Sequence, residues 1–191
     1  MKSFFFRLFC RILGFLLLLQ ASPGRAEETG PNISDISITT SQAHLLLYCS
    51  IKNGFTEEMM TGVKNGIPVT FTFLIELEKA VKNWPDSTLT EMTIEHTLTY
   101  DPLNEQYQVT LPERSNGAVV TESLDKAMAA MTELSGIKII SLKELEPDAP
   151  YALHVHATLA EKTLPLNMHY LVPFISLWDF ATETRTIEFR Y

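Results

Sequence analysis

Cysteine is nearly absent from this chain, because only Cys10 and Cys49 occur among its 191 residues. Cys10 lies in an N-terminal segment that we expect to be removed, so the remaining protein holds one thiol and no intramolecular disulfide. Its core must therefore hold the fold without covalent cross-links. Cys49 alternates with Leu45, Leu47 and Ile51, which predicts a buried strand residue rather than a reactive thiol.

Basic residues are also scarce in most of the chain. Four of the 15 Lys and Arg residues fall within the first 26 positions, which leaves 11 basic against 23 acidic residues and a net charge of −12. A chain this acidic repels phosphate backbones, so we expect no nucleic acid among its partners. The same charge disfavours docking onto anionic lipid. Membrane attachment is expected only if the N-terminal leader stays uncleaved.

Motifs of catalysis are missing as well. The sequence contains no Gly-x-Ser-x-Gly elbow and no glycine-rich phosphate loop. Acidic pairs such as Glu57-Glu58 are expected on solvated faces in so acidic a chain. His96 falls on the apolar face of a strand with Ile94 and Leu98, which favours a hydrogen-bonded core residue over a catalyst. We therefore expect no cofactor, and we favour a non-enzymatic protein.

The first 26 residues have the anatomy of a secretory signal peptide. Basic residues come first, an apolar run covers 12–19, and small residues follow at Gly24 and Ala26. A bilayer-spanning helix needs about 20 apolar residues, and basic residues interrupt this segment too early to reach that length. We predict cleavage before Glu27 and a periplasmic protein, with an uncleaved N-terminal anchor as the alternative.

The remainder of the chain predicts a lead-in over 27–32 and a single β-rich domain over 33–191. An alternation with a period of two residues dominates the domain. The clearest strand follows Pro68, and its apolar face comprises Val69, Phe71, Phe73, Ile75 and Leu77. About seven such strands with hairpin-length connections predict a mainly β fold, an antiparallel β-sandwich with two short helices. A strongly curved sheet or half-barrel is the alternative.

Two short segments break the alternation and predict helices. The first follows Thr56, a good N-cap residue, and ends before Gly66. The second is predicted from Glu122 to about Leu134, because its apolar residues recur every three or four positions. Gly136 follows at the position where a glycine would end that helix.

Several segments together resemble a known family. The most specific of them is Tyr100-Asp101-Pro102-Leu103-Asn104-Glu105-Gln106-Tyr107. The other matching segments are Asn65-Gly66-Ile67-Pro68, Ser123-Leu124, Leu145-Glu146-Pro147, Leu164-Pro165-Leu166 and Trp178. They are similar to the domain of unknown function 4390, a family of exported proteins of Gram-negative bacteria. The resemblance implies a small envelope protein, and it implies no catalytic residues because the family has no assigned function.

His154 and His156 form the arrangement that most resembles a metal site. Alternation places both imidazoles on one face of a strand, where they could share an ion if His44, His169 or a carboxylate supplied a third ligand. A pair of solvated strand histidines is the commoner explanation of this spacing. His154 and His156 are therefore the candidate metal ligands of an alternative function, an envelope enzyme or metal-binding protein.

A strongly apolar segment near the C-terminal end contains Pro165 and Pro173, which prevent it from forming a regular central strand. We predict that Tyr170, Phe174 and Trp178 contact a partner, an envelope protein of unknown identity. Burial of this segment in the core is the alternative. Taken together, the sequence predicts a non-enzymatic periplasmic binding or interaction module of the cell envelope.

Overall fold

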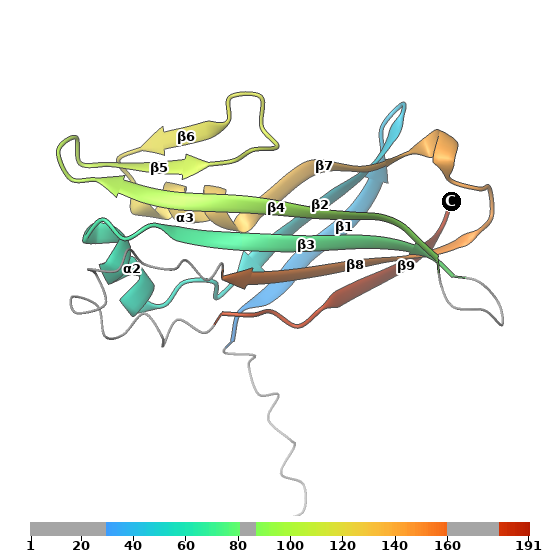
Figure 1. Cartoon of the computed structure of the whole chain (residues 1–191), viewed down its shortest axis with the longest axis horizontal. Coiled ribbons are helices and arrows are strands. Elements are labelled where there is room, and N and C mark those ends of the chain that lie inside the picture. The colour runs from blue at the N-terminus through green and yellow to red at the C-terminus, as the bar shows by residue number, and fades with distance from the viewer. Residues whose placement is uncertain (1–29, 81–86, 160–179) are drawn as a thin grey trace, which may run out of the picture.

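The computed structural model describes residues 30–80, 87–159 and 180–191, which form a mainly β fold with two short helices (Figure 1). The elements in chain order are β1 (Asn32–Thr40), β2 (His44–Lys52), α2 (Glu57–Lys64), β3 (Val69–Lys79), β4 (Ser87–Asp101), β5 (Gln106–Thr110), β6 (Ala118–Thr121), α3 (Leu124–Thr132), β7 (Glu133–Ser141), β8 (Pro150–Leu159) and β9 (Arg185–Arg190). A single 3₁₀ turn covers Leu142–Glu144.

The strands form two antiparallel sheets. One has three strands in the order β1-β2-β7, and the other has six in the order β6-β5-β4-β3-β8-β9. In Figure 1 the six-stranded sheet faces the viewer, and β1 and β2 run diagonally behind it. The predicted antiparallel β-sandwich is confirmed, with nine strands among the described residues where about seven were expected.

The hydrophobic core lies between the two sheets. β3 is its centre, because Phe71, Phe73, Ile75 and Leu77 all have fully buried side chains on its inner face. This is the apolar face that the alternation predicts. Cys49 on β2 is also buried, as predicted, and burial raises the pKa of its thiol to about 12. The thiol is therefore a small apolar core group at any ordinary pH.

Helix α2 begins after Thr56 as predicted, whereas α3 begins at Leu124, two residues after the predicted Glu122. The Thr56 hydroxyl accepts a hydrogen bond from the Met59 amide at the start of α2, and the Ser123 hydroxyl accepts one from Lys126 at the start of α3. These caps satisfy amides that have no partner inside the helix. Helix α3 packs against β4, β5 and β6 and also contacts β2, so it fills space between the sheets.

The end of α3 differs from the prediction. The helix stops at Thr132, before the expected Leu134, and Glu133 begins β7 directly. Gly136 lies inside β7 with φ +70, at a point where Leu47 of β2 pairs with Ile137 and the next residue of β2 pairs with Ser135. Gly136 is thus the extra residue of a β-bulge and not a helix stop. The sequence alone suggests a helix stop because both roles call for a glycine with positive φ.

The β4–β5 hairpin forms around the most specific segment of the family resemblance. Tyr100 pairs with Tyr107 across the two strands, and their ring centroids are 4.7 Å apart. The Asp101 carboxylate accepts hydrogen bonds from the Asn104 side chain and from the Leu103 and Asn104 amides. These bonds, led by the one from the Asn104 side chain, lower the pKa of Asp101. The segment therefore closes a turn.

Candidate functional site

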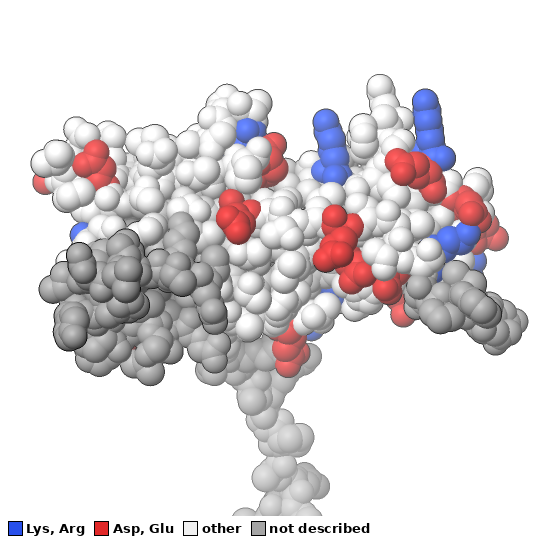
Figure 2. Space-filling view, in the orientation of Figure 1, with Lys and Arg blue, Asp and Glu red and all other residues white. Residues whose placement is uncertain are grey.

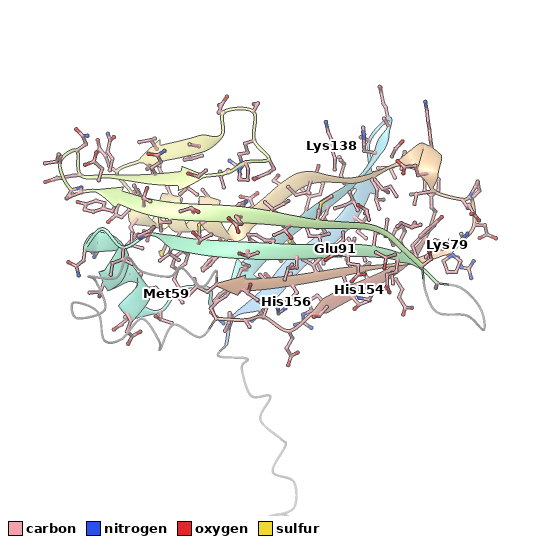
Figure 3. All side chains as sticks on the ribbon, in the orientation of Figure 1. Met59, Lys79, Glu91, Lys138, His154 and His156 are labelled. Carbon is pink, nitrogen blue, oxygen red and sulfur yellow. The ribbon has the colours of Figure 1, made fainter. Side chains whose placement is uncertain are left out.

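The six-stranded sheet carries the predicted histidines on its solvent-facing side. We call this surface the outer patch and define it as Leu74, Glu76 and Glu78 of β3, Glu91, Thr93 and Glu95 of β4, His154 and His156 of β8, and Thr186 of β9. Their positions alternate with the buried core residues of the same strands. Figure 3 shows Glu91, His154 and His156 on the sheet that faces the viewer.

Strand register arranges the outer patch in rows across the sheet. In one row Glu76 lies between Glu91 on β4 and His154 on β8, and His154 is paired in turn with Thr186 on β9. In the next row Leu74 lies between Thr93 and His156. Residues directly opposite on adjacent strands have neighbouring side chains, so four strands contribute to one continuous surface.

His154 is held at both ring nitrogens. Its Nε2 lies 3.2 Å from Glu78 Oε2, and its Nδ1 lies 2.9 Å from the Thr186 hydroxyl. A carboxylate only accepts hydrogen bonds, so Nε2 carries a proton and donates it to Glu78. In the neutral ring Nδ1 then accepts from Thr186, and in the charged ring it donates to the Thr186 oxygen. The two contacts fix the orientation of the ring on the sheet.

The outer patch is acidic around this histidine. Glu76 faces Glu91 directly across β3 and β4, a pairing of like charges that weakens a sheet. Thr88 on β4 donates a hydrogen bond to Glu76, and Glu95 is exposed further along the same strand. Figure 2 shows Asp and Glu atoms on this face above and beside the centre of the sheet. The surface therefore favours cationic over anionic groups.

Leu74 is an apolar residue at the middle of this polar surface. Its side chain is 37% exposed, and it is one of four exposed large hydrophobic residues in the described ranges. Its neighbours along β3 and across the sheet are Thr72, Glu76, Thr93 and His156. An apolar centre surrounded by polar groups is the usual anatomy of a protein contact surface.

Of the predicted third ligands, the structure places a carboxylate, that of Glu78, beside His154. His44 lies on β2 in the other sheet, and His169 lies outside the described residues. Over 30–80, 87–159 and 180–191 no group of three or more His, Cys, Asp or Glu is arranged to hold a metal ion. The metal role of His154 and His156 stays a prediction.

Two further predictions fall outside the described residues. The predicted partner contacts Tyr170, Phe174 and Trp178 lie in 160–179, and the predicted signal peptide lies in 1–29. Among the residues that are described, neither α2 nor α3 is long and apolar enough to cross a membrane.

Sequence reasoning missed the two partners of His154. The alternation along β3 does place Glu78 on the polar face, but only the pairing of β3 with β8 brings it to His154. Thr186 reaches the ring because β9 pairs with β8 on the other side. No local pattern contains this information, since the three strands are separated along the chain.

The fold and the outer patch together define a mainly β protein with two antiparallel sheets and a solvated acidic face. The chain belongs to the family described as domain of unknown function (DUF4390), whose model matches residues 28–188. This confirms the resemblance drawn from the hairpin segment and the other matching segments. Neither a curated protein nor a solved structure matches the chain.

Proposed function

We propose that this protein is a non-enzymatic interaction module of the cell envelope, exported to the periplasm, that contacts another envelope protein through the outer patch. The observation that carries the proposal is Leu74, an exposed leucine at the centre of a polar sheet face. The order of basic, apolar and small residues over 1–26 supports export.

The outer patch suits a protein partner because it is already formed on a rigid element. β3 pairs along its length with β4 on one side and β8 on the other, so little ordering of the backbone is needed on binding. Leu74 would bury its side chain against the partner, while His154 and the surrounding carboxylates form the polar rim. Acidic rim groups increase the rate of encounter with a basic surface and make that rate dependent on salt.

Cross-linking from inside living cells tests the outer patch. A photo-crosslinking amino acid at Thr93, the exposed neighbour of Leu74, should yield a discrete adduct with one envelope protein. Leu74→Asp should reduce that adduct about tenfold or more, because it places a charge where an apolar contact is buried. The yield of adduct, normalised to the amount of folded protein, is the measurement.

The matched control places the same cross-linker at Lys138, an exposed residue of β7 in the other sheet. It should give no adduct with that envelope protein. Equal adducts from Thr93 and Lys138, or an adduct from Thr93 that is insensitive to Leu74→Asp, would contradict the proposed face.

The apolar segment that contains Tyr170 and Phe174 is proposed as a second contact region. Tyr170→Ala and Phe174→Ala should weaken capture of the cross-linked partner while leaving the denaturant midpoint nearly unchanged, because a contact made only in the complex contributes to binding and not to folding. Trp178→Ala is expected to act in the same direction. If these variants lower the stability by several kcal/mol instead, the segment belongs to the core.

A further inference from the structure

His96 is a titratable group sealed inside the fold. It lies on the inner face of β4, its side chain is fully buried, and its ring centroid is 5.0 Å from that of Phe73. Its Nδ1 lies 2.9 Å from the carbonyl oxygen of Met131, in the last turn of α3. Carbonyls in the last turn lack a partner within the helix, and a carbonyl only accepts. Nδ1 therefore carries a proton and caps α3.

The other ring nitrogen faces a carboxylate from a different part of the chain. His96 Nε2 is 3.3 Å from Oε1 of Glu113, which lies in the connection between β5 and β6. In a neutral ring this nitrogen offers a lone pair to an anion. Of the described side chains, His96 Nε2 and Glu113 Oε2 are two of the three buried polar atoms that find no hydrogen-bond partner. One added proton on Nε2 would give the pair a charge-assisted hydrogen bond.

Glu113 has a second, competing partner. The Arg114 Nε lies 3.9 Å from the same Oε1 atom, and the Arg114 side chain is 38% exposed. The connection itself is a tight turn, in which the Leu111 amide donates to Gly117 and the Gly117 amide donates to Arg114. One carboxylate oxygen of Glu113 therefore lies within reach of both His96 and Arg114.

The other titratable groups that the structure describes near His96 do not form an ion pair with its ring. Asp125 and Lys126 of α3, and Glu133 at its end, are exposed. On the opposite sheet the thiol of Cys49 is uncharged, because burial raises its pKa to about 12. β3 contributes aromatic and aliphatic residues to the inner face. Within the described part of the chain, Glu113 and Arg114 are the charges that act on His96.

We propose that His96 and Glu113 form a buried, pH-sensitive latch, in which proton uptake by His96 fastens the β5–β6 connection to α3 and the six-stranded sheet. Loss of that proton releases Glu113 toward Arg114 and loosens the turn. The latch joins three elements that are separate in the chain, β4, α3 and the 111–117 turn. It is independent of the outer patch, which lies on the other face of the same sheet.

Two opposite pH trends follow from this geometry. Burial lowers the pKa of His96, and the Met131 carbonyl and the Glu113 carboxylate partly offset it. An unfolded chain, where the histidine pKa is about 6.5, therefore binds this proton more readily than the folded one. His96 contributes stability above about pH 6.5 that is lost as the pH falls through its folded pKa. When the turn alone opens, His96 stays buried and loses only the Glu113 carboxylate, which favours its charged form. A charged His96 therefore binds the closed turn more tightly, so acid should disfavour local opening of the turn.

Hydrogen exchange of the full chain tests the latch. Protection factors of the hydrogen-bonded Leu111, Arg114 and Gly117 amides should rise severalfold as the pH is lowered from about 7.5 through the lowered pKa of His96. The Ser41 amide, hydrogen-bonded in the β1–β2 turn, serves as an internal reference that should not rise. Unchanged or falling protection of the 111–117 turn would overturn the proposal.

The variant Glu113→Gln distinguishes a pH-sensitive latch from a turn whose stability does not depend on the charge of His96. The Gln amide donates to the neutral Nε2 without any added proton, so turn protection should become independent of pH. The midpoint of the His96 ring titration, followed by NMR, should fall because the carboxylate that favours the charged ring is gone. The control is Glu95→Gln, next to His96 but on the opposite face of β4, which should keep the wild-type pH dependence. A Glu113→Gln protein with the wild-type pH dependence or the wild-type midpoint would overturn the latch.

Discussion

Phe73→Ala should lower the free energy of unfolding by about 3–5 kcal/mol, the usual cost of deleting a buried phenylalanine ring. Phe73 is fully buried in the middle of β3, paired with Ile94 on one side and Ala157 on the other. Its ring also packs against His96. The cavity left by alanine is enclosed by paired strands on both sides, so the surrounding backbone has little freedom to collapse into it.

The measurement is a urea titration of the wild type and the variant, analysed with a common slope. Leu74→Ala is the matched control, because it is the next residue of β3 and points to the solvent side with 37% exposure. It should change the stability by only about 0.5 kcal/mol. A Phe73→Ala protein with the wild-type midpoint would mean that the inner and outer faces of β3 are assigned the wrong way round.

The faces of the strands were predictable because they depend on local alternation. Phe73 and Leu77 are buried on the face that the period of two predicts, and Thr56 and Ser123 begin the two helices because short polar side chains satisfy free amides there. These features depend on residues a few positions apart. Nothing in them requires knowledge of which strand lies beside which.

β7 shows where local reasoning fails. It follows α3 with no connecting loop, and its bulge at Gly136 carries the same signal as a helix end. Ile139 and Ile140 are both buried, which breaks the alternation that would have revealed a strand. Its pairing with β2 depends on tertiary contacts between distant parts of the chain.

In the candidate site, too, only the features that depend on a single strand were predictable. The shared face of His154 and His156 is a property of one strand and was predictable. The contacts of His154 with Glu78 and Thr186, and the contact of His96 with Glu113, join strands and turns that are far apart in sequence. Chemistry that depends on sheet order is therefore visible only in the folded chain.

A second large effect is expected at the stack of aromatic rings that ties the last part of the chain to the core. Phe71 is fully buried on β3, and its ring lies parallel to that of Phe180, with centroids 4.5 Å apart and planes at 8°. Phe55, ahead of α2, lies on the same ring at 5.0 Å. A Cβ on the buried Gly54 would touch both rings, 3.4 Å from Phe71 and 3.5 Å from Phe180, and would lie only 3.0 Å from Ile51 Cγ2, so the backbone at Gly54 packs closely against the stack.

Phe71→Ala should therefore cost about 3–5 kcal/mol, and Phe180→Ala should be of similar size, because each leaves part of one shared cavity. The double variant should cost less than the two single variants together, with a coupling of about 0.5–1.5 kcal/mol from the stacked rings. The double-mutant cycle is measured from the urea midpoints of the wild type, the two single variants and the double variant.

Phe189 provides the control cycle, because it stacks on Tyr151 at the other end of the sheet and not on Phe71. Phe71→Ala and Phe189→Ala should be additive within about 0.5 kcal/mol, as expected for distant sites. Additivity of Phe71 and Phe180 as well would show that their contact contributes nothing to stability. Coupling confined to Phe71 and Phe180 would show that the core reaches from β3 to the residues just before β9, which is the attachment that lets β9 place Thr186 beside His154 in the outer patch.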